Sequence, residues 1–494
     1  MEEYEKVQPP HGVSSAPDTS SMPTKASNND ANTFPYPSQT ARLSSYGYYS
    51  NLFYGNHFSA FAANIDNEEY NRNYGRLRYV MVNFAGLISK IVADMLFSEP
   101  IVVKVPNGDQ NWVDAFIYEN NLHTQLYESA LSNSFYGDGL FKIRTGPRQK
   151  GQSNTVIVEE ITPTIYFPKI NGFNVREVPN EQELAWTFKI GDKTYLRKEI
   201  HTPGLIRNEC FLMEGDKIRE QVDISIIGID GLLPEVSTGI DRHLLTHTPN
   251  WKTGNRFFGI SDYYDMDNLF YAVNNRMTKI DNILDKHSDP ILMVPPGVLD
   301  EKGRVNKKAL GVVEIAEGEN NKPEYIVWDA SLENAFKEIE KIVEFIYLTS
   351  EISPDVLGLG EGISDSGRAL KFKLMRTIAK VARKKLYYDR AIKDMLYIAQ
   401  LMAKEHGLSV GGVKLKEEPV VPEIEWSDGL PIDNSEQIQT ESIAIDAGIT
   451  SKKASIMRVY KVDEVAAKKM LKEVKDETTI ALPKMNLGYT SDDK

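Results

Sequence analysis

The stretch that most constrains this chain runs from Ser331 to His406. It starts with an amphipathic helical pattern, Ser331 to Ser350, which ends before Pro354. A loop with glycines at 358, 360, 362 and 367 follows, and after it an unbroken helical pattern runs from Arg368 to His406. At 1.5 Å per residue such a helix is a rod of roughly 58 Å. The mean helix has only about 11–12 residues, so a rod of this length needs a large surface to pack on.

This long helical pattern is strongly basic within an acidic protein. Between Arg368 and Lys393 there are ten lysines or arginines and one acid, Asp389, which gives a net charge of +9. The whole chain carries −13, so the remainder carries −22. One interpretation is a solvated helix face. The other is a helix that packs beside identical copies, with its cations facing acids such as those of residues 417–446 or an anionic polymer. The second fits the length better, because a lone rod has little to pack on within one subunit.

Composition limits the classes of protein that are compatible with the chain. Its 494 residues, 41% apolar and 10% aromatic, are sufficient for about two to four folded domains. The single cysteine, Cys210, cannot close an intrachain disulfide, and no signal-peptide pattern follows Met1, so we expect folding in a reducing cytoplasm. The most hydrophobic window, residues 79–97, is interrupted by Asn83, Lys90 and Asp94, which favours a buried helix over a membrane span. The net negative charge disfavours tight, non-specific clamping of nucleic acid.

The first half of the chain predicts a flexible arm followed by an α+β domain. Residues 1–45 are rich in Pro, Ser, Asn and Thr and poor in aliphatic side chains, so they cannot offset the entropy of ordering. Residues 46–73 are dense in Tyr, Phe and Asn, which is typical of packing against a neighbouring molecule. From Thr155 to Ile226 the apolar period becomes two, and this predicts an antiparallel meander of about six strands. The elements expected here are helices at 76–97, 112–119 and 124–135, strands at 98–105 and 140–144, and turns at 137–139, 191–192 and 214–216.

The second half predicts a helical hairpin with a small β head, followed by the long helix. Residues 261–286 and 331–350 show apolar residues at three- and four-residue steps, and short strand patterns lie between them at 290–328. Residues 417–446 hold nine acids and no Lys or Arg, and a Pro-containing run at their start is compatible with a strand. Residues 442–474 are helical again, with a joint at 448–451 where Ser451 is the expected N-cap. The last twenty residues are predicted to form a flexible tail.

The glycine loop is not a catalytic motif. A phosphate-binding loop needs Gly-x4-Gly-Lys-Ser/Thr, and this string is absent from the chain. A nucleophile elbow needs Gly-x-Ser-x-Gly between a strand and a helix, whereas Gly362-Ile-Ser-Asp-Ser-Gly367 differs by one residue and follows a loop. We therefore favour a capping role for Ser364, Asp365 or Ser366 and a conformational role for the glycines.

No metal or nucleophile site stands out elsewhere. His243 and His247 have the i, i+4 spacing of zinc ligands, but the pair lacks the glutamate of a metallopeptidase helix and a cysteine partner, so a loop or strand-end pair is favoured. Cys210 lies in a strand pattern and is favoured as a small buried side chain. We expect no metal, no cofactor and no enzyme activity.

The order of these elements resembles that of the portal proteins, or head–tail connectors, of tailed bacteriophages, particularly the type of long-tailed phages of Gram-positive hosts. Five stretches carry the resemblance: ISKIVADMLFSEPIVV at 88–103, FYGDGLFK at 135–142, residues 250–262 with Gly259 and Ser261-Asp262, SEISPDVLG at 350–358 followed by SGRALK at 366–371, and the helix pair around AGITS at 447–451. Together they span about residues 46–475. None is as strict as a phosphate-binding loop, but their order is specific.

The resemblance implies an α+β portal fold with a wing, an α-helical stem, a small β clip and an α-helical crown, assembled as a ring of about twelve subunits. The implied divisions are a disordered arm (1–45), wing (46–260), stem helix (261–286), clip (287–330), second stem helix (331–350), tunnel loop (351–366), long helix into wing and crown (367–406), acidic connection (407–446), crown helices (447–475) and flexible tail (476–494). The long arm is unusual, and the resemblance leaves its role open.

The resemblance also implies the function and its residues. The ring would sit at one capsid vertex of the virion, made in the host bacterial cytoplasm, and conduct double-stranded DNA during packaging and ejection without touching a membrane. Implied partners are other copies of the chain, the terminase large subunit, the head–tail adaptor, and the major capsid and scaffolding proteins. The implied DNA-channel residues are Asp355, Leu357, Leu359, Gly360, Glu361, Gly362 and Ser364. Residues implied near the channel are Lys337, Lys341, Arg368 and Lys371. Those implied to dock partners at the clip are Pro295, Pro296, Asp300, Lys302, Arg304, Lys307 and Lys308.

Two other readings remain open from the sequence. One is a minor capsid or adaptor protein that forms a ring but does not conduct DNA. The other is a nucleic-acid-processing enzyme whose site has no recognisable motif. Assembly state separates them, because a ring with a central hole favours the portal and a compact monomer favours the enzyme.

Overall fold

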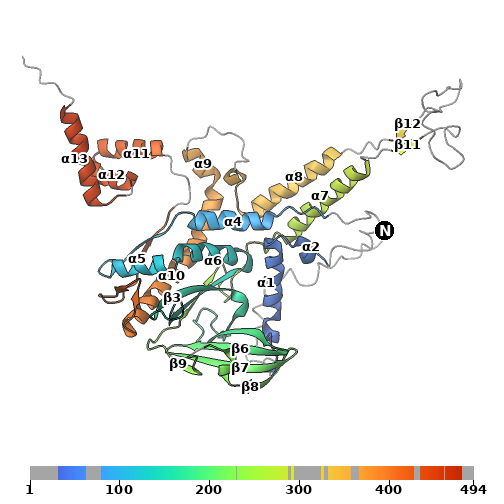
Figure 1. Cartoon of the computed structure of the whole chain (residues 1–494). Coiled ribbons are helices and arrows are strands. Elements are labelled where there is room, and N and C mark those ends of the chain that lie inside the picture. Colours follow the sequence, from blue (N-terminus) through green and yellow to red (C-terminus); the bar gives the residue numbers. More distant parts are fainter. Residues whose placement is uncertain are drawn as a thin grey trace, which may run out of the picture. The chain divides into compact units, whose positions relative to one another are not determined.

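The computed structural model describes residues 32–62, 79–229, 231–287, 291–293, 324–326, 332–357, 367–427, 434–460 and 462–480. The chain divides into two compact units, the first formed by residues 1–360 and 374–429 and the second by residues 361–373 and 430–494. Helices and sheets are mixed in the chain, which confirms the expected α+β class in its coarse form (Figure 1). Among the described residues no helix is both long enough and apolar enough to cross a bilayer.

Five α-helices are described in the first part of the first unit. They are α1 (Thr40–Phe53), α2 (His57–Ala60), α4 (Phe84–Phe97), α5 (Gln110–Glu119) and α6 (Leu122–Tyr136). The side chain of Asn83 caps α4 by accepting a hydrogen bond from the Gly86 amide. The helix expected from residue 76 thus begins later, at Phe84. The reason lies in α7 (Asp267–His287), where Thr278 Oγ1 and Asn274 Oδ1 accept the backbone N–H groups of Val80 and Val82 and so hold residues 79–83 outside the helix.

The N-terminal boundary and the aromatic stretch differ from expectation. Residue 45 is not where order begins, because Phe34 is buried and Thr33 already bridges to Lys217. The aromatic stretch expected to pack on a neighbour instead forms α1, whose Tyr46 and Tyr49 are buried within the unit. Its ring contacts reach Tyr136 and Tyr263 of the same chain. Residues 1–31 and 63–78 lie outside the described part of the chain.

Two antiparallel sheets follow the helices. The first has the order β10-β2-β3, and the second has the order β4-β5-β6-β7-β8 with β9 paired to β7. The strands are β2 (Asp138–Gly146), β3 (Thr155–Ile161), β4 (Tyr166–Pro168), β5 (Gln182–Ile190), β6 (Lys193–Thr202), β7 (Leu205–Glu214), β8 (Lys217–Val222), β9 (Glu235–Ser237) and β10 (Leu245–Pro249). The hairpin turns expected at 191–192 and 214–216 are confirmed.

The expected six-strand meander is wrong in two places. The VIVEEI run is β3, which pairs with β2 in the smaller sheet. The last strand is β8, and Ile224–Ile227 forms a 3-10 turn behind the Asp223 cap. Alternation identifies strands but not their partners, since each of these runs presents an apolar face that fits either sheet.

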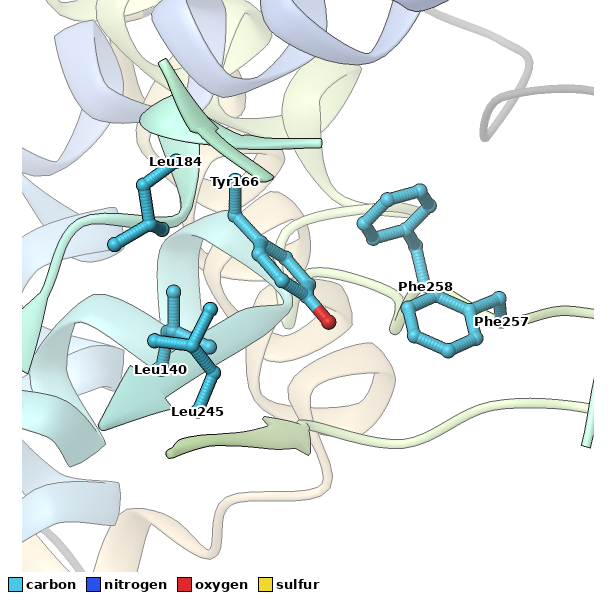
Figure 2. Packing of buried hydrophobic residues seen from close by; sticks show 6 residues of the cluster. All are labelled: Leu140, Tyr166, Leu184, Leu245, Phe257 and Phe258. Carbon is cyan, nitrogen blue, oxygen red and sulfur yellow. The ribbon is translucent and has the colours of Figure 1, made fainter. Parts of the chain in front are cut away.

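The two sheets share a hydrophobic core. Tyr166 and Leu184 of the larger sheet pack with Leu140 and Leu245 of the smaller one, and Phe257 and Phe258 complete the cluster from the loop after β10 (Figure 2). Cys210 is buried in β7 beside Tyr195 and Ile224, which confirms its interpretation as a small core side chain.

A helical hairpin leaves this part of the unit. α7 (Asp267–His287) and α8 (Leu332–Ser350) pack along each other, and the short antiparallel pair β11 (Ile291–Met293) and β12 (Glu324–Ile326) lies at their far end (Figure 1). The expected first helix, 261–286, is shortened because residues 261–266 form turns. The expected second helix, 331–350, matches α8.

The long helix is interrupted near its start. α9 (Gly367–Lys373) belongs to the second unit, and α10 (Met375–Glu405) belongs to the first, with Leu374 between them. The expected single rod of 39 residues is therefore a 31-residue helix preceded by a separate short one. α10 does not lack a packing surface in its own chain, because it contacts β10, β3, β2 and α4.

The chain after α10 returns to the first unit before it enters the second. β13 (Ser409–Val410) and β14 (Val413–Lys414) form a small hairpin, and β15 (Glu423–Glu425) pairs with β1 (Val102–Lys104), so both short strands expected at 98–105 and near 423 are confirmed. The second unit contains α11 (Asn434–Asp446), α12 (Lys452–Tyr460) and α13 (Glu464–Ile480). Ser451 caps α12 as expected, through its Oγ and the Ala454 amide. Helix formation already begins at Asn434, inside the expected acidic connection.

Candidate functional site at the base of the helical hairpin

Most residues expected to contact DNA or partners fall outside the described residues. This holds for Leu359, Gly360, Glu361, Gly362 and Ser364 of the loop, and for Pro295, Pro296, Asp300, Lys302, Arg304, Lys307 and Lys308 between β11 and β12. Asp355 and Leu357 are described and lie in a 3-10 turn, Pro354–Leu357, directly after α8. Ser353 Oγ donates to Asp355 Oδ2 over 2.8 Å.

The expected near-channel cations are divided between the two units. Lys337 and Lys341 are exposed on α8 and pair with acids of the same helix, Glu333 at 2.6 Å and Glu344 at 2.5 Å. Lys371 lies in α9 of the second unit, as does the backbone of Arg368. Their expected role thus stays a prediction.

The structure does bring the 250–262 stretch together with α6 and α10 at the base of the hairpin. Their centre is the buried carboxylate of Asp262, just before α7. Lys384 Nζ lies 2.7 Å from Asp262 Oδ2, and Lys380 Nζ lies 3.1 Å from Asp262 Oδ1. Ser134 Oγ donates to Oδ2 over 2.7 Å, and Asn250 Nδ2 donates to Oδ1 over 3.1 Å. Side chains from α6, the 250–262 loop and α10 therefore meet at one carboxylate.

The electrostatics of this cluster are dominated by its two lysines. Burial would raise the pKa of Asp262, but the charges of Lys380 and Lys384 outweigh it and hold the pKa well below the usual range. Burial also lowers the pKa of Lys384 to about 8, against the opposing attraction of Asp262. One carboxylate thus serves two buried ammonium groups, and its loss would leave both uncompensated.

A close backbone contact holds the 250–262 loop against the α6–β2 turn. Gly137 ends α6 with a φ of +90°, and its carbonyl accepts the Asn250 amide over 2.7 Å. A Cβ at Gly259 would lie 2.0 Å from the Gly137 oxygen, so a side chain has no room there. The two glycines belong to different sequence motifs, and this contact explains why both positions need glycine.

Asp138, next to this contact, forms a second buried hub. Its Oδ1 accepts from the Gly259 amide over 2.8 Å and lies 2.7 Å from His247 Nε2, and its Oδ2 accepts from Tyr46 OH over 2.6 Å. Burial would raise the pKa of Asp138, but the hydrogen bond and charge of His247 lower it. His247 is therefore a strand side chain that orders this hub. This agrees with the interpretation favoured from the sequence, a loop or strand-end histidine and not a zinc ligand.

The end of α8 is fastened to α10. Lys380 Nζ donates to the Ser350 carbonyl over 2.9 Å, and Thr377 Oγ1 donates to the Glu351 carbonyl over 3.2 Å. Glu351 has a φ of +59°, and its carboxylate pairs with Arg376 at 3.2 Å and with Arg383. The loop that leaves α8 thus departs from a fixed point, because its first residues are bonded to the first turns of α10.

The arrangement is suited to mechanical support rather than chemistry. Each oxygen of Asp262 and of Asp138 is engaged by at least two groups or by a buried phenol, so neither is a free acid or base. No group of three or more His, Cys, Asp or Glu side chains suited to a metal ion occurs among the described residues. What the site fixes is the position of α7, the end of α8 and α10 relative to the sheets.

Sequence reasoning missed Asp262, Lys380 and Lys384 as one cluster. A signal was present in α10, where Lys380 and Lys384 occupy the same helical stripe as buried Val381, Tyr388 and Ile392. A lysine in an apolar stripe predicts a buried partner acid. The partner itself could not be chosen, because Asp262 lies 122 residues away from Lys384.

Comparison with known proteins relates the second half of the chain to one family. Residues 249–480 match the family model "Phage portal protein, SPP1 Gp6-like". The matched segment begins at the 250–262 loop and extends through the helical hairpin, α10 and the helices of the second unit. The match supports the expected portal protein in this coarse form.

Solved structures also show likenesses. One is a chain in the neck of an empty GTA particle computed with C6 symmetry, with 10% identity and a TM-score of 0.43, covering 80% of this chain and 92% of that chain. Another is a chain in the virion of a native gene transfer agent particle, with 10% identity and a TM-score of 0.42, covering 82% and 98%. No curated protein matches the chain.

Proposed function

We propose that this protein is a phage portal protein, whose copies form a ring of about twelve subunits at one capsid vertex and conduct double-stranded DNA. The family match over residues 249–480 carries the proposal. In this assignment α7 and α8 are the stem, the segment around β11 and β12 is the clip, and residues 351–366 form the tunnel loop. The clip would dock the terminase large subunit during filling and the head–tail adaptor afterwards. The narrower type, that of long-tailed phages of Gram-positive hosts, rests on the sequence motifs alone.

The described geometry supports a stem role for the hairpin. α7 and α8 are joined by an ion pair between Arg276 and Glu338 at 2.9 Å, and their base is fixed by the Asp262 cluster. On α8, Phe345 and Leu348 are three residues apart and so lie on one face, and they are 52% and 66% exposed. An apolar stripe left uncovered within one chain is what a neighbouring copy in a ring would bury.

The proposed channel residues have the chemistry expected of a low-drag pore. Cationic contacts to phosphates displace counterions and add affinity, so a passage for sliding DNA should present few of them. We assign the narrowest point to Asp355, Leu357, Leu359 and Glu361, which are acidic or apolar. Arg368 and Lys371 would lie behind it, and Lys337 and Lys341 along the stem, where internal acids already pair with them.

Negative-stain microscopy of the purified protein tests the proposal. Rings of about twelve-fold symmetry with a central hole are expected. A compact monomer would contradict it and favour a nucleic-acid-processing enzyme.

Conduction is tested separately from ring formation. Gly360→Pro with Gly362→Pro should leave rings intact and abolish DNA filling of heads, because proline fixes φ and removes the freedom that a moving loop needs. Gly47→Ala, in α1, is the control. Normal filling by the proline variant would instead support a ring that does not conduct DNA through this loop.

A further inference from the structure

A cationic pocket lies on the first unit, away from the Asp262 cluster. It is enclosed by the loop at residues 175–179, by β10 and by the middle of α10, and its volume is about 440 Å³. Tyr166, Leu245 and Phe257 supply an apolar floor, and Tyr387 and Tyr397 of α10 form one wall. This volume and this apolar lining are typical of a site that takes an aromatic side chain or a small ligand.

Three cations of the pocket form no ion pair with any described side chain. Arg176, Arg242 and Lys252 line it, and none makes an ion pair with a described residue. Lys252 Nζ donates only to the Phe257 carbonyl, over 3.2 Å. Burial lowers the pKa of Lys252, the negative charge of Asp138 opposes this, and the charge of Arg176 adds to it.

The acids that line the pocket are already engaged. Asp394 pairs with Arg390 at 2.7 Å, and Glu177 accepts a hydrogen bond from Asn171 Nδ2 over 2.7 Å. The pocket therefore has an excess of positive charge above an apolar floor.

Two polar atoms of the lining are also unsatisfied. Thr246 is 8% exposed, and its Oγ1 has no hydrogen-bond partner among the described residues. His243 Nδ1 is also buried and has no hydrogen-bond partner among the described residues, and burial lowers the pKa of His243. Buried polar atoms without partners are uncommon in folded proteins, so their presence in a pocket points to a ligand that satisfies them.

We propose that this pocket binds the N-terminal segment Glu2-Glu3-Tyr4-Glu5 of the same chain, with Tyr4 on the apolar floor and the glutamates facing Arg176, Arg242 and Lys252. The segment lies in residues 1–31, outside the described residues. Its Tyr4 stands between Glu3 and Glu5, so an aromatic side chain has a carboxylate on each side in the sequence. Charge and hydrophobicity are thus complementary on both partners.

The segment can reach the pocket. The described chain begins on the other face of the sheet, where Phe34 packs on Phe167 with ring centroids 5.5 Å apart, whereas the adjacent Tyr166 of β4 faces the pocket, so the linker must pass round the sheet edge. The linker from Glu5 to residue 32 could extend to about 90 Å and has a coil dimension on the order of 30 Å. Tethering places the segment at an effective concentration on the order of millimolar, so a few weak charge pairs suffice to hold it.

The test uses the full chain with a photoreactive benzoylphenylalanine at position 4. After irradiation and digestion, mass spectrometry is expected to find position 4 linked to residues 175–179 or 386–398 within one polypeptide. Crosslinks spread over other surfaces, or linked dimers at the same residues, would overturn the intrachain site. The readout does not depend on ring assembly, so it can fail or succeed separately from the proposed function.

A charge exchange supplies the matched control. Arg176→Glu with Lys252→Glu should lower the crosslinking yield several-fold, and adding Glu3→Lys with Glu5→Lys should restore it. Exposed charges are screened at high salt, so the native yield should also fall as ionic strength rises to about 1 M. If the reversed pocket crosslinked as well as the native one, or if it lost binding to a short DNA duplex while the arm crosslinks stayed unchanged, the proposal would be wrong.

Discussion

At the residue scale, the stability of the base of the helical hairpin depends on one acid, which compensates the charges of two buried lysines. Asp262, Lys380 and Lys384 are all less than a tenth exposed, so water cannot replace a missing partner. Basic residues of α10 were expected to face solvent, neighbouring copies or an anionic polymer, yet at least six of the ten between 368 and 393 pair with acids of their own unit. The charge count was correct, but the pairing could not be read from it.

Removing the acid should cost far more than removing one lysine. Asp262→Ala leaves two buried cations unpaired and should lower the free energy of unfolding by about 3–5 kcal/mol. Lys384→Met keeps the Asp262–Lys380 pair and fills the space with an apolar chain of similar length. It should therefore lower the free energy of unfolding by less than about 2 kcal/mol. Urea unfolding followed by circular dichroism measures both. Equal losses would show that the carboxylate is not the centre of the cluster.

The Gly137–Gly259 contact predicts a steric effect. Gly259→Ala places a methyl group 2.0 Å from the Gly137 oxygen, so the backbone must move and the protein should lose at least about 2 kcal/mol. Gly47→Ala is the matched control, because a Cβ there meets no atom within 4 Å and alanine favours the helix. Thermal unfolding of the two variants should shift in opposite directions. A neutral Gly259→Ala would contradict the close contact.

Asp267, at the start of α7, predicts a pH dependence of stability. Burial raises its pKa to about 6, so ionisation in the folded state costs free energy that the unfolded chain does not bear. The sign follows: stability falls as pH rises from about 4 to 6, and the full cost remains at pH 8. Asp267→Asn should therefore raise the free energy of unfolding at pH 8 by up to about 3 kcal/mol and leave it nearly unchanged at about pH 3, as urea unfolding at the two pH values measures. A variant that destabilises equally at both pH values would contradict this.

At the element scale, local signals predicted elements well and partners poorly. The ends of α8, the turn at Gly137 and the Ser451 cap followed from apolar period, glycine and capping chemistry. β3 was placed in the wrong sheet, and the break at Leu374 was missed because residues 368–406 contain no proline or glycine before Gly407. Strand partners and helix breaks are set by tertiary contacts, as when α7 side chains hold residues 79–83 outside the helix.

The exposed stripe of α8 predicts an assembly phenotype. Phe345→Glu with Leu348→Glu adds charge where a neighbouring copy would pack, so rings should be lost while the circular dichroism spectrum and melting of the monomer stay unchanged. Glu340→Gln, also exposed on α8, should assemble normally. Size-exclusion chromatography with light scattering distinguishes the two. Intact rings from the doubly charged variant would remove α8 from the subunit interface.

At the scale of the whole molecule, acids outnumber cations and engage part of the basic segment at residues 368–393. The chain carries −13, and six of the ten cations of this segment pair with four carboxylates of the first unit. Each phosphate contact contributes about 0.9 to the slope of log affinity against log salt. The assembled protein should therefore bind blunt duplex DNA weakly, with a slope smaller than about 3 between 50 and 200 mM salt.

Fluorescence anisotropy of a labelled duplex, titrated with assembled protein over this salt range, measures the slope. Asp389→Asn with Asp394→Asn is the sensitivity control, because it frees Lys393 and Arg390 from partners at 2.8 and 2.7 Å and should steepen the slope by up to about 2. A native slope of 6–10, about that of a protein that grips DNA through many phosphates, would contradict a low-drag channel. A shallow native slope that steepens in the variant would show that the internal acids themselves keep the protein from holding duplex DNA tightly.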